Sequence, residues 1–319
     1  MFDIRIENLS KTYKQKNCPH IRAVDNLNLH IEPGQLIGFL GPNGAGKTTT
    51  IKMICSLVKP TSGHVYIGQY DVWYKRGLTM PLIGAVLEGT RNVHWPLSAW
   101  DNLIYFGHLK GIHGKALSVR SEQMLRELDL WDRRNDLVRS FSRGMQQKVA
   151  IACALVADPP IVLLDEPTLG LDVQAARVVK DMVRHLVKDL GKTVVLTTHQ
   201  LDVAQVLCDR VAIIRKGQLI ADQPVQQLLD LFRSEYYEFR LEGSLSSIQG
   251  LFLDNLGMKE ENGVTVLTGP VKGQEELFAY IDQLRGTGLP LISVSRSEPD
   301  LEEVFVRLLD SQDGMEFSQ

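Results

Sequence analysis

Residues Gly41 to Thr48 read Gly-Pro-Asn-Gly-Ala-Gly-Lys-Thr and match the pattern G-x-x-x-x-G-K-[ST]. The apolar run Leu36–Leu40 precedes them and a helix is expected over about 48–57, so the pattern lies between a strand and a helix. Its glycines allow a tight loop whose backbone N–H groups close on phosphate oxygens. The sequence therefore predicts a phosphate-binding loop (P-loop), with the positive end of a helix dipole behind it.

Two side chains of this loop have separate tasks in the pattern. Lys47 reaches the β- and γ-phosphates of a nucleotide, and the Thr48 hydroxyl binds Mg²⁺. The other residues expected to contact the nucleotide here are Gly41, Pro42, Asn43, Gly44, Ala45, Gly46 and Thr49.

A second motif completes the expected nucleotide site. The four apolar residues Ile161–Leu164 are followed by Asp165 and Glu166. A buried strand with acids only at its end presents carboxylates at the edge of the sheet, where ligands bind in such folds. Asp165 is expected to hold Mg²⁺ through its water shell, and Glu166 fits a general base for an attacking water.

Composition limits the class of protein. The net charge of −3, with 44% hydrophobic and 23% charged residues, is ordinary for a soluble globular protein and indicates no bulk attraction to nucleic acid. No stretch approaches the ~18 apolar residues of a membrane span, and the N-terminus does not look like a signal peptide. Cys18, Cys55, Cys153 and Cys208 lack CxxC spacing, so we expect buried free thiols in a reducing, cytoplasmic compartment.

Strands and helices alternate along most of the chain, which predicts a mainly parallel sheet covered on both faces. Beyond a composition shift near 224–234, a separate small α/β domain is expected. Strands are predicted at 3–9, 23–31, 36–40, 64–67, 161–164, 194–198, 211–215, 236–241, 264–267 and 291–295. Helices are predicted at 100–109, 118–130, 145–156, 173–190, 201–208, 247–256, 274–284 and 300–309, with a turn at 16–20.

The segment Phe141-Ser142-Arg143-Gly144-Met145 narrows the class. Alone, a serine at a helix start is only an N-cap. Between the P-loop and Asp165, however, the segment resembles the signature motif of ABC transporter nucleotide-binding domains, usually Leu-Ser-Gly-Gly-Gln. Leu169-Gly170-Leu171-Asp172 is similar to their D-loop, His199 to the switch histidine, and Tyr13 to the aromatic residue that stacks on adenine. The resemblance covers about 4–222.

This resemblance implies an α/β P-loop NTPase with a RecA-like core, an antiparallel β subdomain and a helical subdomain. We expect the ABC ATP-binding domain at 1–225, its helical subdomain at about 89–156, a C-terminal α/β accessory domain at 235–310, and a disordered tail at 311–319. It also implies that ATP and Mg²⁺ are bound between two chains. Ser142, Arg143, Gly144, Met145 and Asp172 of one chain would then face the ATP on Lys47 of the other, in a homodimer or a heterodimer.

The chain departs from the family pattern at two places. The glutamine that usually follows the segment 83–87 and contacts the metal site is Glu88 here. A carboxylate can ligate Mg²⁺ but cannot donate a hydrogen bond as an amide can. Glu88 is either tolerated because the metal offsets its charge, or it makes hydrolysis more dependent on Mg²⁺. In the signature, Arg143 and Met145 replace the usual glycine and glutamine; Arg143 can approach the opposite γ-phosphate or point to solvent, and we favour solvent.

The expected function is the ATP-hydrolysing subunit of an exporter, on the cytoplasmic face of the membrane, with a separately encoded permease and no nucleic-acid partner. The pattern at 297–305 resembles the closing segment of drug- and antibiotic-export subunits.

An aromatic-rich patch after Glu88 either docks the permease, which we favour, or closes the core between subdomains. It contains Trp95, Pro96, Leu97 and Trp100. Alternatives are an importer subunit, whose extension is more often a β-barrel, and a non-transport ABC ATPase acting on ribosomes or DNA.

Overall fold

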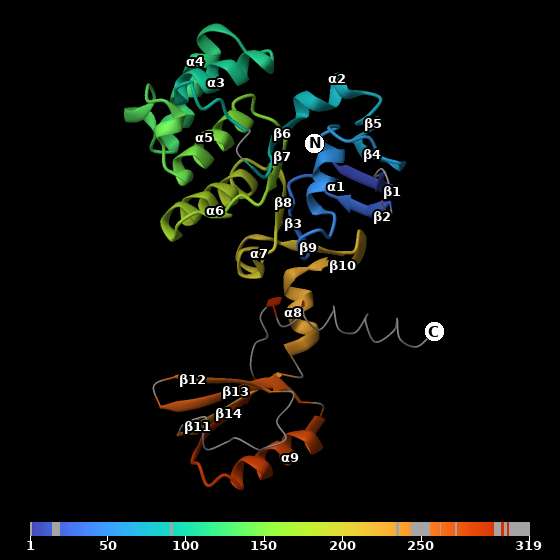
Figure 1. The fold of residues 1–319 in the computed structure, drawn as a ribbon, viewed down its shortest axis with the longest axis vertical. Coiled ribbons are helices and arrows are strands. Elements are labelled where there is room, and N and C mark those ends of the chain that lie inside the picture. The colour runs from blue at the N-terminus through green and yellow to red at the C-terminus, as the bar shows by residue number, and fades with distance from the viewer. Residues whose placement is uncertain are drawn as a thin grey trace. The chain divides into compact units, whose positions relative to one another are not determined.

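The computed structural model describes residues 2–14, 20–89, 92–233, 236–243, 256–261, 263–271, 273–296, 301–302 and 305. The chain divides into two compact units, Met1–Gln223 and Pro224–Gln319, whose elements are labelled in Figure 1. Four expected features lie wholly or mostly outside the described residues: the turn at 16–20 with Cys18, the helices at 247–256 and 300–309, and the tail at 311–319.

A six-stranded sheet forms the centre of the first unit, in the order β10-β9-β3-β8-β7-β6. The neighbours from β9 to β6 all pair in parallel, which confirms the predicted parallel sheet. Every residue of β3 and β7 is buried, because helices cover both faces. The strands are β3 (Leu36–Leu40), β6 (Ile83–Val86), β7 (Ile161–Asp165), β8 (Thr193–Thr198), β9 (Arg210–Arg215) and β10 (Gln218–Pro224).

Helices pack on the two sides of this sheet (Figure 1). On one side, Ile51 and Ile54 of α1 join Phe39 and Leu163 of the sheet in one buried cluster. On the other side lie α5, α6 and α7. The bounds are α1 (Lys47–Ile54), α5 (Arg143–Leu155), α6 (Val173–Lys188) and α7 (Leu201–Leu207).

The sequence pattern does not predict β6. The strand has only four residues, and Gly84 is one of them. A Cβ at Gly84 would lie 2.4 Å from the Ala154 carbonyl oxygen of α5, so the close approach of the helix requires glycine. Because β6 ends at Val86, the following segment with Glu88 begins at the same sheet edge as Asp165.

Two smaller parts complete this unit. An antiparallel sheet in the order β2-β1-β4-β5 places the buried side chains of Ile4, Leu27 and Ile31 in the same cluster as α1. Its strands are β1 (Ile4–Tyr13), β2 (Ile21–Ile31), β4 (Ser62–Ile67) and β5 (Tyr70–Asp71). The helical part contains α3 (Ala99–Leu109) and α4 (Gly114–Glu127) with the start of α5; short helices are α2 (Arg76–Thr79), η1 (Met80–Leu82), η2 (Trp131–Arg133) and η3 (Val138–Ser140).

The second unit is a small α/β domain. Its antiparallel sheet has the order β12-β13-β11-β14, and Phe239 and Leu267 of the sheet pack with Tyr280 and Leu284 of α9. Since β13 and β14 are both antiparallel to β11, they are parallel to each other, and α9 joins them in a split βαβ unit. Its elements are α8 (Val225–Arg233), β11 (Tyr236–Glu242), β12 (Gly257–Glu261), β13 (Val264–Pro270), α9 (Gly273–Arg285) and β14 (Leu291–Arg296).

The three described cysteines are buried and unpaired, which confirms that expectation for Cys55, Cys153 and Cys208. Burial raises the pKa of the Cys55 and Cys208 thiols to about 12, so they stay protonated near neutral pH. In the part of the chain that the structure describes, no helix has both the length and the apolar character that crossing a membrane demands.

Candidate active site

The P-loop joins β3 to α1 and has a backbone that only glycine adopts comfortably. Gly41 and Gly46 have φ values of 152° and 109°. A Cβ at Gly41 would lie 2.1 Å from the Ile214 carbonyl oxygen, and one at Gly46 would lie 2.3 Å from that of Ala23. Strands β9 and β2 therefore pack directly against the loop. A loop of this kind can turn its backbone N–H groups towards a phosphate at the start of the following helix.

Lys47 is buried inside this loop. Its Nζ donates hydrogen bonds to the carbonyl oxygens of Gly41 (2.6 Å) and Pro42 (3.2 Å). Burial lowers the pKa of Lys47, while the nearby carboxylates, first Glu166 and then Asp165, oppose that shift. The ammonium group is thus held beside the acids that end β7.

The buried carboxylate of Asp165 accepts hydrogen bonds from three separate segments of the chain. Its Oδ1 accepts hydrogen bonds from the hydroxyls of Thr48 (3.1 Å) and Thr197, and its Oδ2 accepts one from the Glu88 backbone N–H (3.4 Å). The side chains of Thr48 and Asp165 supply hard oxygen donors of the kind that Mg²⁺ prefers. Of the three residues expected at the metal, Thr48 and Asp165 therefore lie in direct side-chain contact, and Glu88 meets Asp165 through its backbone N–H.

Glu166 has two unusual features. Its φ is 51°, a left-handed conformation that is rare for a residue with a side chain, and its N–H donates to the carbonyl and hydroxyl oxygens of Thr197, each at 3.1 Å. Its Oε1 is hydrogen-bonded to Nδ1 of His199 at 2.9 Å. Its Oε2 is buried and has no hydrogen-bond partner among the described residues. One carboxylate oxygen is therefore oriented by His199, and the other is available to accept a proton.

A cleft of about 570 Å³ connects most of the predicted site residues. The P-loop residues from Asn43 to Thr49 line it together with Tyr13, Glu88, Glu166 and His199. Tyr13 is 37% exposed at the end of β1. The volume suits a ligand of nucleotide size, and the exposed ring offers a flat apolar surface.

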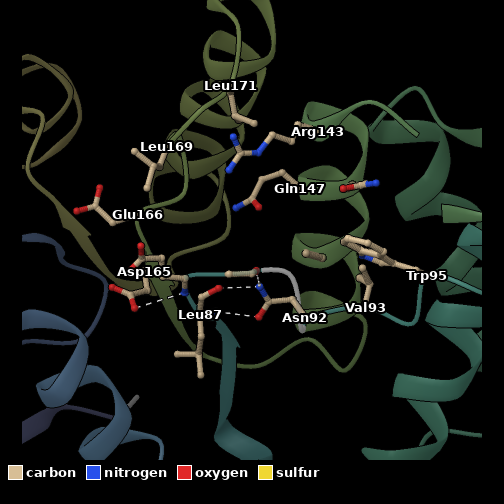
Figure 2. A pocket seen from close by; sticks show the side chains of 14 residues that line it. Leu87, Asn92, Val93, Trp95, Arg143, Gln147, Asp165, Glu166, Leu169 and Leu171 are labelled. Carbon is tan, nitrogen blue, oxygen red and sulfur yellow. Dashed lines mark hydrogen bonds between the residues drawn. The ribbon is translucent and has the colours of Figure 1, made fainter. Parts of the chain in front are cut away.

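Asn92 is a site residue that the sequence did not indicate. Its side chain accepts from the Leu87 N–H (2.9 Å) and donates to the carbonyl oxygens of Leu87 (2.6 Å) and Gly89 (3.0 Å), which holds the backbone around Glu88 (Figure 2). A single asparagine in a polar segment is too common to be a signal. Only the contacts in the folded chain reveal this role.

The signature residues lie outside the P-loop cleft of their own chain. Ser142 caps α5 and accepts a hydrogen bond from the Met145 N–H at 3.4 Å. A Cβ at Gly144 would lie 2.6 Å from Cβ of Ala175, so α5 packs closely on α6, whose start Asp172 caps. Neither Ser142 nor Gly144 lines the cleft.

Arg143 and the expected docking residues are partly exposed. Arg143 is exposed, and its guanidinium group lies next to Gly170. Trp95 is 40% exposed. Trp100 is half-buried, with its ring edge-on to that of Trp131 at 6.0 Å between centroids.

The sequence is similar to a known family and to several known proteins. Residues 24–169 match the family model described as ABC transporter, and residues 236–295 match a domain of unknown function, DUF8691. The chain is 35% identical to the ABC transporter ATP-binding protein NatA of Bacillus subtilis, over 73% of this chain and 94% of that protein. It is 34% identical to the daunorubicin/doxorubicin resistance ATP-binding protein DrrA of Streptomyces peucetius, over 90% of this chain and 88% of that protein.

The fold is likewise similar to that of a solved structure. The dimeric ATP-binding cassette MJ0796, in a post-hydrolysis state bound to ADP and Pi, has a TM-score of 0.64 and 32% identity. The similarity covers 70% of this chain and 98% of that one.

Proposed function

Because this chain belongs to the family of ABC transporter ATP-binding proteins and is an ATPase, we propose that it drives an exporter whose permease is a separate membrane protein. The observation that carries export is the extent of similarity to the daunorubicin/doxorubicin resistance protein, which spans 90% of this chain. The similarity to NatA spans 73%. The similarity that supports export thus extends beyond the ATPase core into the second unit.

ATP is held by the groups that line the P-loop cleft. The loop N–H groups and Lys47 bind the phosphates, and the Tyr13 ring stacks on adenine at the rim. Thr48 and Asp165, with Glu88 beside them, would hold Mg²⁺, which would supply positive charge to offset that of the phosphates. Glu166 accepts the proton of the attacking water through its free oxygen, while His199 orients the carboxylate and contacts the γ-phosphate.

Two chains complete each site. Ser142, Gly144 and Met145 lie at the start of α5, where N–H groups attract anions, yet they do not reach the cleft of their own chain. We infer that they cover the γ-phosphate on a partner ATPase subunit, which is either a second copy or a related chain. The dimeric state of the MJ0796 cassette supports this arrangement. Loss of the γ-phosphate would then open the pair.

The permease docks on the exposed aromatic surface next to the Glu88 segment. Trp95 and Pro96 are exposed there, and large aromatic side chains are common anchors at protein interfaces. Docking at this surface would bring the chain to the cytoplasmic face of the membrane. Asn92, only three residues before Trp95, would link a movement of the surface to the backbone of Glu88.

The exporter proposal is tested by what copurifies with the tagged chain from gently solubilised native membranes. We expect a stoichiometric protein with several membrane spans. Recovery with an extracytoplasmic substrate-binding protein as well would favour an importer. Recovery only from the soluble fraction, with ribosomes or DNA-associated proteins, would contradict the transporter role and support the non-transport ATPase instead.

Glu88→Gln is expected to raise the Mg²⁺ concentration that gives half-maximal ATPase activity by about 2- to 5-fold, the scale of an exposed charge interaction. Glu88 adds negative charge in the cleft beside Asp165 and Glu166, and this charge attracts the cation, so the variant without it needs more metal. ATPase rates are measured over a series of free Mg²⁺ concentrations. Superimposable curves would mean that Glu88 is simply tolerated. Glu122→Gln, on exposed α4, is the matched control.

A further inference from the structure

Arg143 makes a contact that the usual signature glycine cannot make. A Cβ built on Gly170 would lie 2.5 Å from Nη1, 2.9 Å from Cζ and 3.2 Å from Nη2 of Arg143. Three atoms of the guanidinium group are thus close to one point above the Gly170 backbone. Figure 2 shows the side chain of Arg143 reaching from α5 towards Leu169 and Leu171, the neighbours of Gly170.

The side chain of Arg143 is positioned by packing against the Gly170 backbone rather than by an ion pair. Among the described residues, Arg143 has no hydrogen-bond or ion-pair partner. Gly170 has a φ of 70° and no side chain, so its backbone offers a flat surface for the planar guanidinium group. A side chain at position 170 would displace the guanidinium group of Arg143, and the φ of 70° would also strain any residue other than glycine there.

The covered segment leads directly to the catalytic acid. The Leu169 N–H donates to the Glu166 carbonyl oxygen at 3.2 Å, and Leu169 and Glu166 both line the P-loop cleft. Glu166 itself has a strained backbone, which persists only where its surroundings hold it. A second, smaller cavity of about 160 Å³ is lined by Arg143 together with Leu169, Asp165 and Glu166.

We propose that Arg143 is a positioning residue for ATP hydrolysis: by packing on Gly170, it holds the segment 169–172 and thereby the orientation of Glu166. This inference rests on the proposed function of the P-loop cleft. It assigns Arg143 a task within its own chain, so it does not depend on where a second subunit lies. ATP binding does not need this contact, whereas the hydrolysis step does.

A double-mutant cycle tests the contact. Wild type, Arg143→Ala, Gly170→Ala and the double variant are compared for kcat, KM and equilibrium ATP affinity. We expect Arg143→Ala to lower kcat about 5-fold and Gly170→Ala about 10-fold, with little change in ATP affinity. The double variant should be no slower than Gly170→Ala, because the added methyl group at position 170 has already displaced the guanidinium group. Multiplication of the two losses, to about 50-fold, would overturn the proposal.

Further variants separate shape from charge. Arg143→Lys keeps the charge but lacks the plane, so its kcat should fall like that of Arg143→Ala; a wild-type kcat would overturn the packing role. Weaker ATP binding by Arg143→Ala would overturn it too, indicating direct contact with nucleotide. Arg139→Ala, an exposed arginine nearby, should behave as wild type. Arg143→Gln replaces Arg143→Ala if the latter fails to fold.

The two proposals fail in different ways. Absence of ATP hydrolysis in the wild-type chain would contradict the function proposed for the cleft. An active wild type with additive variants would contradict only the role of Arg143.

Discussion

Glu166→Gln is expected to lower kcat for ATP hydrolysis by ~10²–10⁴-fold, the usual scale for loss of a general base. The amide cannot accept the proton of the attacking water. Nothing in the P-loop changes, so ATP binding should remain within about 2-fold of wild type, since P-loop contacts and not Glu166 hold the phosphates. Phosphate release is measured under single-turnover conditions, and ATP affinity by equilibrium titration.

The geometry makes this substitution a clean test. Glutamine has the same shape, and its amide can still hydrogen-bond to His199, which now contacts Oε1 at 2.9 Å. The strained backbone at position 166 should therefore be preserved. Glu122→Gln, on the exposed surface of α4, controls for loss of a carboxylate elsewhere. Near wild-type turnover of Glu166→Gln would mean that another group is the base.

Lys47→Ala is expected to weaken ATP binding by ~10²–10³-fold. Truncating one partner of a buried, hydrogen-bonded charge pair costs about 2–5 kcal/mol, and each ~1.4 kcal/mol is tenfold in affinity. The ammonium group is buried and already held towards the loop by the carbonyl oxygens of Gly41 and Pro42. Water would have to replace it beside the phosphates.

Equilibrium titration with ATP in the presence of Mg²⁺ measures this effect. Lys115→Ala, on an exposed turn of α4, is the matched control and should bind ATP as wild type does. Because Lys47 also hydrogen-bonds to the loop carbonyl groups, the melting temperature of each variant is compared without nucleotide. An ATP affinity within about 3-fold of wild type would contradict the role of Lys47, because so small a loss is below the value of a buried charge contact.

Several elements of the fold are predictable from local sequence. Two motifs can be recognised from short stretches of sequence. They are the apolar run at β3 followed by glycines and the apolar run at β7 followed by two acids. A strand that is buried on both faces must be apolar along its whole length, and the residues just after it form the ligand site at the sheet edge. Both requirements are visible in the local sequence. By contrast, β6 is short and contains a glycine, and its pairing with β7 depends on contacts that local periodicity does not record.

The sequence by itself determined the P-loop, the positions of Asp165 and Glu166 at a strand end, and the parallel sheet that carries them. Only the tertiary structure decided that His199 meets Oε1 of Glu166, that Asn92 holds the Glu88 segment, and that Arg143 covers Gly170. The physical reason is the range of the interactions. The motif residues follow from the local conformation of their own segment, so they can be read from neighbouring residues. The other contacts join side chains from separate elements and form only when packing brings those elements together.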